Sequence, residues 1–214
     1  SGGLVGSEMC IRDRYNSRYQ GFTPPSRPTA HAVTGQGEVN IYWDDAAEYS
    51  RDVVTGYADF EGYKIYKSRD GGNTWGNPDD MIYDTDGIFA GWRPYRQYDL
   101  SAEEDSLHCV YSRGFDCPEE SRRGHPINGQ DPYFPWFSLG TDTGLDAIKL
   151  DEPVVINGDT MRYMFKDQNV TDGLEYTYSV VAYDMGVEPP FKETYADIGG
   201  GPVSYTHLRA HETS

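Results

Sequence analysis

The chain has 214 residues, a formal net charge of −17 at pH 7, and 18 tyrosines within an aromatic content of 14%. So large an acidic excess repels nucleic acids and anionic membrane surfaces, which excludes nucleic-acid recognition as the main role. The sequence has no apolar run of the length that a membrane-spanning helix requires. A chain rich in tyrosine, glycine and proline and poor in lysine is typical of an all-β extracellular protein.

The two ends of the chain are unlike ordinary protein sequence. Residues 4–14, LVGSEMCIRDR, back-translate into one strand of a sequencing-library adapter, and residues 203–213, VSYTHLRAHET, back-translate into the complementary strand. We therefore expect residues 1–14 and 203–214 to be adapter-derived and to carry no information about fold or function. The same observation predicts that the remaining chain is a piece of a longer protein.

The first half of the remaining chain contains a linker and two predicted strands. Residues 15–28 end in TPPSRP, which cannot be helical and suits a linker that leads into an edge strand. Residues 38–43, EVNIYW, alternate apolar and polar side chains and place Trp43 on the apolar face. Residues 60–68, FEGYKIYKS, alternate in the same way and predict a second strand.

The second half contains three predicted strands. Residues 161–165 form a short one, and residues 174–184, LEYTYSVVAYD, give the strongest strand pattern in the chain. A last extended segment is expected at residues 191–198. No amphipathic helical pattern of useful length and no internal repeat is present.

These segments, taken in order, resemble a fibronectin type III domain. The resemblance rests on the proline-rich start, Trp43 in the second strand, GYKIYKS in the third, and the spacing of Val170, Tyr176 and Val180. In that family a tyrosine at the place of Tyr176 forms the tyrosine corner, whose hydroxyl bonds back to nearby backbone. The resemblance implies an all-β fibronectin type III or immunoglobulin-like β-sandwich at residues 29–202, and a module of a large secreted or surface protein of environmental bacteria.

A large loop-rich insertion, residues 76–158, interrupts the expected sandwich and contains many aromatic residues. The candidates for ligand binding are Trp92, Tyr95, Tyr133 and Trp136. Exposed, these rings could stack on sugars or anchor a protein partner. Buried, they would form the core of the insertion, and this second interpretation is the favoured one.

The segment SRDGGNTW, residues 68–75, matches the Asp-box pattern. Asp70 would cap a tight hairpin turn by accepting backbone N–H bonds, a glycine would take the positive φ, and Trp75 would pack under the turn. Because the pattern occurs once, we expect a structural turn in a sandwich rather than a propeller blade.

Cys109 and Cys117 are the two cysteines outside the adapter-derived ends. A disulfide closing this short loop is favoured, and it would fit an oxidising compartment. Two unpaired thiols are the alternative. A zinc site is less favoured, because only His108 and His125 lie nearby as further ligands.

An acidic turn at residues 84–87, DTDG, raises the possibility of calcium. Asp84 and Asp86 supply the carboxylate oxygens that Ca²⁺ prefers, but the EF-hand spacing is missing, since the twelfth position counted from Asp84 is Tyr95. A solvated turn is the default interpretation. No other cofactor is expected.

No catalytic motif is recognisable in the sequence, neither a nucleophile elbow nor a zinc-protease helix nor a phosphate-binding glycine loop. The favoured hypothesis is a non-catalytic extracellular or cell-surface module that binds or spaces, with the other domains of the same polypeptide as partners. One alternative is a glycan-binding accessory fragment of a carbohydrate-active enzyme. The other is a self-associating subunit of a surface layer or filament.

Overall fold

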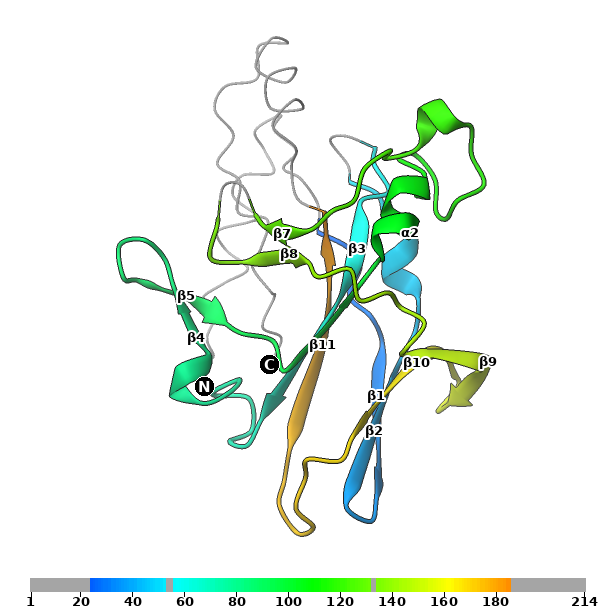
Figure 1. Cartoon of the computed structure of the whole chain (residues 1–214). Helices are drawn as coiled ribbons and strands as arrows, with labels where there is room; N and C mark the ends of the chain where they lie inside the picture. Colours follow the sequence, from blue (N-terminus) through cyan, green and yellow to red (C-terminus); the bar gives the residue numbers. More distant parts are fainter. Residues whose placement is uncertain (1–23, 53–55, 132–133, 186–214) are drawn as a thin grey trace, which may run out of the picture.

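The computed structural model describes residues 24–52, 56–131 and 134–185 (Figure 1). The elements are, in chain order, β1 (Ala30–Gly35), β2 (Glu38–Trp43), η1 (Ala46–Tyr49), β3 (Phe60–Ser68), η2 (Pro78–Asp80), β4 (Met81–Tyr83), β5 (Phe89–Trp92), β6 (Arg96–Asp99), α2 (Ala102–Leu107), η3 (Glu119–Ser121), β7 (Gly129–Gln130), β8 (Ser138–Gly140), β9 (Lys149–Ile156), β10 (Asp159–Asp167) and β11 (Thr177–Asp184). Within these ranges no helix is long and apolar enough to cross a membrane.

Two antiparallel sheets form the body of the molecule. The first has the strand order β1-β2-β10-β9 and the second has the order β11-β3-β6. Two further pairs, β4-β5 and β7-β8, are separate small sheets. In Figure 1 the β4–β5 hairpin projects from the side of the body. The prediction of an all-β sandwich is confirmed.

The core lies between the two main sheets. Trp43 and Tyr63 are fully buried, and their rings contact that of Tyr163 at centroid distances of 5.8 and 5.2 Å respectively. Because side chains of a strand alternate between its faces, each strand contributes every second residue to this core. The other buried members from β2, β3, β10 and β11 are Val39, Ile41, Phe60, Ile65, Phe165, Val180 and Ala182.

The strands with the clearest alternation match their predicted ranges. The observed β2 and β3 cover residues 38–43 and 60–68 in full, and β10 extends the predicted 161–165 at both ends. The predicted 174–184 strand begins at Thr177 instead. The predicted strand 191–198 and the predicted adapter-derived ends lie outside the described residues.

The proline-rich segment leads into an edge strand, as the sequence indicated. This strand, β1, pairs with β2 from Ala30↔Trp43 to Gly35↔Glu38. Sequence alternation did not reveal β1, because all but one of its residues are exposed and it therefore has no apolar face. Its pairing comes from the tight turn at Gly37, whose φ is +67°.

The range 76–158, expected to be an insertion, contributes two strands to the sandwich itself. The first, β6, pairs with β3, and the second, β9, pairs with β10. Close approach at the β3–β6 pair depends on Gly62, because a Cβ there would collide with the backbone oxygen of Tyr98. The β4–β5 and β7–β8 pairs of this range stand outside the main sheets.

Candidate binding surface

An aromatic row covers the outward face of the β4–β5 hairpin. The pairing places Met81 opposite Trp92 and Tyr83 opposite Phe89, with a register shift between them. The ring of Phe89 contacts those of Tyr83 and Trp92 at centroid distances of 6.3 and 5.6 Å, both edge to face. The Tyr83 hydroxyl donates to Met81 Sδ at 3.5 Å. These four side chains therefore share one face, which we call the aromatic row.

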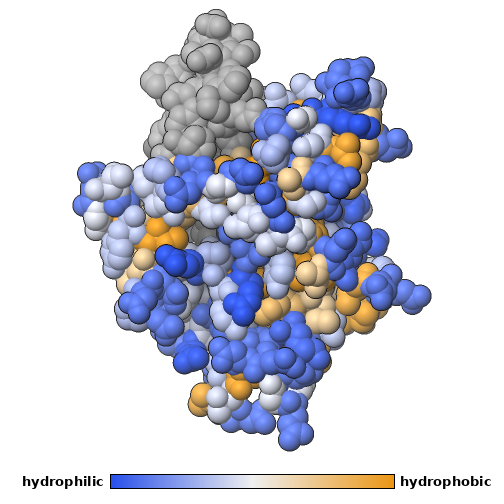
Figure 2. Space-filling view, in the orientation of Figure 1, coloured by the Kyte–Doolittle hydropathy of each residue, from blue (hydrophilic) through white to orange (hydrophobic). Residues whose placement is uncertain are grey.

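Tyr83 and Phe89 of the aromatic row are exposed to solvent, whereas Met81 and Trp92 are half-buried. Tyr83 is 50% and Phe89 44% exposed, and Ile88 in the turn beside them is 64% exposed. Figure 2 shows a largely hydrophilic surface with small hydrophobic patches, one of them over this hairpin. Exposed rings that contact one another are typical of binding surfaces, where aromatic side chains supply most of the buried area.

The opposite face of the hairpin rests on the segment 134–137. The ring of Phe137 lies against Gly91, where an added Cβ would come 3.4 Å from it. Trp136 contacts both Phe137 and Phe134 through its ring, at 6.3 and 5.7 Å. Gly91 and Trp92 are neighbours in β5 and therefore point to opposite faces of the hairpin. Phe137 contacts the face of Gly91, and the Trp92 ring lies on the other face.

Carboxylates fix the two ends of the hairpin. In the turn, Asp84 Oδ1 accepts the backbone N–H groups of Asp86 and Ile88 at 2.9 and 2.8 Å. At the base, Asp80 Oδ2 accepts the N–H of Asn77 at 2.8 Å. The hairpin is therefore held by local hydrogen bonds rather than by pairing with the main sheets.

The calcium prediction for Asp84 and Asp86 gains no further ligand in the structure. One oxygen of Asp84 is already used by the turn. No group of three or more His, Cys, Asp or Glu side chains within the described ranges is arranged to hold a metal ion. Calcium binding at Asp84 and Asp86 stays a prediction.

The three predicted ligand-binding aromatic residues that the structure describes do not form one surface. Trp92 belongs to the aromatic row, whereas the ring of Trp136 packs against Phe134 and Phe137. Tyr95 packs against the main core, and its hydroxyl donates to Asp167 Oδ1 at 2.9 Å. Tyr133 lies outside the described residues. Sequence inspection missed Tyr83 and Phe89, although the alternation of β4 and the short DTDG turn could have indicated a hairpin.

The 68–75 turn has a dense set of hydrogen bonds. Asp70 accepts the backbone N–H of Thr74 at 2.9 Å and the hydroxyl of Ser68 at 2.7 Å. These bonds lower the pKa of Asp70 to about 2, with the Thr74 N–H as the largest cause. Gly72 has a φ of +93°, and Trp75 lies within contact distance of it. The turn thus closes on its own tryptophan.

Tyr176 lies just before β11 and ties down the preceding loop. Its hydroxyl accepts the backbone N–H of Thr171 at 3.0 Å. Close by, Lys67 and Asp167 form an ion pair of 2.7 Å with side chains only 6% and 1% exposed, and the hydroxyl of Tyr178 donates to Asp167 at 2.7 Å. Burial acts to raise the pKa of Asp167, but the hydrogen bonds from Lys67 and its other donors outweigh burial and lower it.

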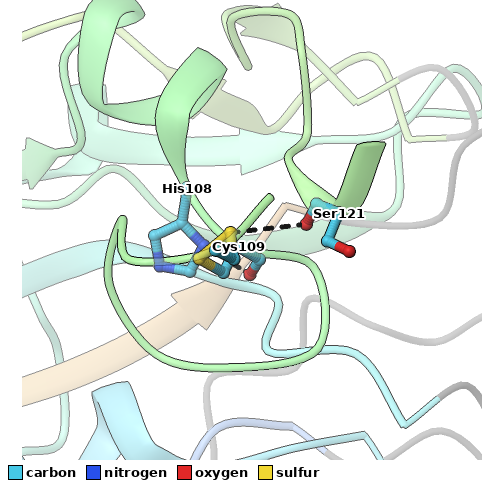
Figure 3. Close-up of a disulfide and its surroundings, with 4 residues drawn as sticks. His108, Cys109 and Ser121 are labelled. Atoms are coloured by element: carbon cyan, nitrogen blue, oxygen red, sulfur yellow. Dashed lines mark hydrogen bonds between the residues drawn. A yellow bond between two sulfur atoms is a disulfide. The ribbon is translucent and has the colours of Figure 1, made fainter. Parts of the chain in front are cut away.

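Cys109 and Cys117 form a disulfide (Figure 3). The loop that it closes is also held by backbone bonds, from Cys109 N–H to Gly114 O and from Val110 N–H to Ser121 O, both 2.8 Å. His108 beside it is buried, and burial is the main cause that lowers its pKa to about 4. The histidine is therefore neutral at physiological pH.

The disulfide loop reaches across to the segment after β2 through Arg113. The Arg113 guanidinium lies 3.0 Å from Asp45, 3.1 Å from Glu48 and 3.9 Å above the centre of the Tyr49 ring. An aromatic face with two carboxylates beside it thus holds a cation in this protein.

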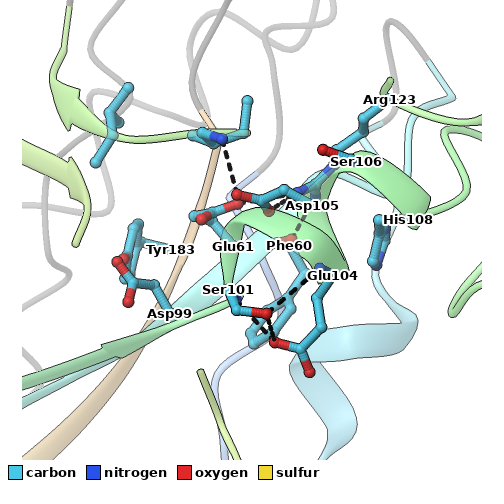
Figure 4. A network of polar contacts seen from close by, with 12 residues as sticks. Phe60, Glu61, Asp99, Ser101, Glu104, Asp105, Ser106, His108, Arg123 and Tyr183 are labelled. Atoms are coloured by element: carbon cyan, nitrogen blue, oxygen red, sulfur yellow. Dashed lines mark hydrogen bonds and ion pairs between the residues drawn. The ribbon is translucent and has the colours of Figure 1, made fainter. Parts of the chain in front are cut away.

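A buried ionic network attaches α2 and the segment after η3 to β3 (Figure 4). Arg123 Nη1 donates to Glu61 Oε2 and to Asp105 Oδ1, both at 2.9 Å, and all three side chains are at most 1% exposed. Asp105 also accepts the N–H of Ile127. Burial raises the pKa of Glu61 to about 9; the Arg123 guanidinium opposes this rise, and the neighbouring Asp105 carboxyl adds to it. Glu61 Oε1 has no hydrogen-bond partner. No sequence signal indicated this network, since its members are far apart in the chain.

Comparison of the chain with protein-family models, with curated proteins and with solved structures finds no match. Any statement about function therefore rests on the geometry of the described residues.

Proposed function

We propose that this chain is a non-catalytic binding module of a larger extracellular or cell-surface protein, built on a fibronectin type III-like sandwich. The observation that carries the proposal is the aromatic row, which sits on a hairpin outside both main sheets and exposes the rings of Tyr83 and Phe89 to solvent. A scaffold that holds a projecting hairpin on a rigid core is a common way to present a binding surface.

The finer assignment to the fibronectin type III type is supported by two features. The sheet orders β1-β2-β10-β9 and β11-β3-β6 pair strands distant in the chain, as Greek-key sandwiches do. The bond from Thr171 N–H to the Tyr176 hydroxyl has the geometry of a tyrosine corner.

An extracellular location is supported by the disulfide, since such bonds persist in oxidising compartments. The non-catalytic assignment is supported by what the buried ionisable groups do. Arg123, Glu61 and Asp105 hold α2 to the sheet, and Lys67 and Asp167 hold the loop before β11. Each of these groups has a structural role that accounts for its burial.

A glycan-binding function is the second candidate, and the exposure of Tyr83 and Phe89 favours it. The ring planes argue against a flat sugar platform, because they are inclined by 76° between Tyr83 and Phe89 and by 69° between Phe89 and Trp92. Self-association, the third alternative, is opposed by the charge of −17 on each copy.

Binding panels of glycans and of peptides test the proposal. The wild type is compared with the double variant Y83A/F89A and with Y111A, which removes another exposed ring, 56% exposed and remote in sequence from the hairpin. We expect a ligand that the wild type and Y111A retain and the double variant loses. If all three proteins bind the same ligands equally, or if none of them binds a ligand, this surface has no binding role. The spacer function would then be the remaining interpretation.

A further inference from the structure

We infer that the aromatic row binds a positively charged protein segment, whose arginine or lysine side chains stack on its rings while neighbouring aspartates neutralise their charge. This inference rests on the proposed binding function of the same hairpin and specifies the chemistry of the partner.

The charge around the aromatic row is the first support. Residues 76–92 contain the four aspartates 79, 80, 84 and 86 and no lysine or arginine. Asp80 and Asp84 are used by local backbone bonds, whereas Asp79 and Asp86 are exposed. The first cation after the row is Arg93, which follows the end of β5. The segment that carries the rings therefore has a net charge of −4, and an acidic segment attracts cationic groups.

The second support is how this protein binds its own cations. Arg113 lies over the ring of Tyr49 with two carboxylates at hydrogen-bond distance. Lys67 lies 4.6 Å from the centre of the Tyr176 ring while it pairs with Asp167. In both places an aromatic face and a carboxylate together hold one cation. The β4–β5 hairpin carries exposed rings and the exposed carboxylates of Asp79 and Asp86 on one short segment, so that a cation from outside would find both groups there.

The same features disfavour other occupants. A second copy of the chain would bring an equally acidic hairpin to the interface, and like charges facing each other at an interface are costly. Nucleic acid and anionic lipid would be repelled for the same reason. Rings inclined to one another present edges and faces in turn, which suits separate cationic side chains better than a continuous sugar chain.

Titration calorimetry of the full chain tests the inference. The probe is a flexible peptide of alternating arginine and glycine, and the matched peptide has citrulline in place of arginine, which keeps the shape and removes the charge. We expect the arginine peptide to bind and the citrulline peptide to bind at least tenfold more weakly. Added salt should weaken binding, because the charges are exposed.

Variants separate the hairpin from the general charge of the protein. We expect Y83A/F89A to weaken binding of the arginine peptide about tenfold, because each exposed cation–ring contact adds a modest amount. D79N/D86N should weaken it several-fold. The control D151N/E152Q removes the same charge from the exposed strand β9 and should leave the affinity nearly unchanged. Since all these side chains are exposed, thermal melts should show intact folding of each variant.

The outcomes distinguish this inference from the proposed function. Equal weakening by D79N/D86N and D151N/E152Q would overturn the inference, since attraction would then be nonspecific. Binding of a neutral oligosaccharide that depends on Phe89, without binding of the arginine peptide, would overturn the inference and keep the proposed function. If the wild type binds no ligand on the panels and no arginine peptide, both the inference and the proposed function are wrong.

Discussion

Replacement of Glu61 by glutamine tests the buried network most directly. Glu61 and Asp105 share Arg123 Nη1, and Glu61 Oε1 is buried without a partner. An ionised Glu61 would therefore leave an uncompensated negative charge in the interior, and the folded protein keeps this carboxyl protonated. Glutamine has nearly the same shape and mimics the protonated form.

The magnitude follows from the pKa of Glu61, which burial raises from 4.5 to about 9. Because the folded state retains a proton that the unfolded state releases, stability is highest below pH 4.5 and falls as the pH rises toward 9. The slope is about 1.4 kcal/mol per pH unit, so that Glu61 accounts for a loss of about 4 kcal/mol between roughly pH 5 and pH 8. The E61Q variant loses this contribution to the pH dependence.

Urea unfolding curves, measured through tryptophan fluorescence at several pH values from 5 to 8, give the free energies of both proteins. The quantity to compare is the difference between E61Q and wild type, in which the contributions of other titrating groups cancel. E152Q removes an exposed carboxylate on β9 and serves as the control. If the difference between E61Q and wild type is constant over this pH range, the assignment of a protonated Glu61 is wrong.

Three further predictions concern the other structural contacts. K67M leaves Asp167 buried without its cation and should lower the free energy of unfolding by about 3–5 kcal/mol. The double variant K67M/D167N should recover part of this loss in the same urea assay, and full stability of K67M would contradict a paired role for Lys67. The double variant C109S/C117S should lose about 2–3 kcal/mol through the opened loop, and reductant should destabilise the wild type but not the variant. Y176F removes the hydroxyl that accepts Thr171 N–H, so we expect faster amide exchange at Thr171 with the sheets intact. Unchanged exchange there would contradict the observed bond.

The sequence by itself determined the local features of this protein. Apolar alternation gave the ranges of β2 and β3, because a strand with one buried face must repeat every second residue. The Ser68–Asp70–Thr74 turn was readable for a similar reason, since all its bonds join residues within a few positions. The favoured pairing of Cys109 with Cys117 likewise followed from the short loop between them.

The tertiary structure alone decided which segments belong to the sandwich and which rings meet solvent. β9 has no buried residue and β6 is short, so their places in the sheets depend on the tertiary arrangement. Trp92, Tyr95 and Trp136 look alike in sequence, but their surroundings differ. Trp92 belongs to the aromatic row, Tyr95 packs against the core, and Trp136 packs against Phe134 and Phe137. Exposure depends on what packs against each ring, and the buried Arg123 network depends in the same way on contacts between distant residues, which no local pattern encodes.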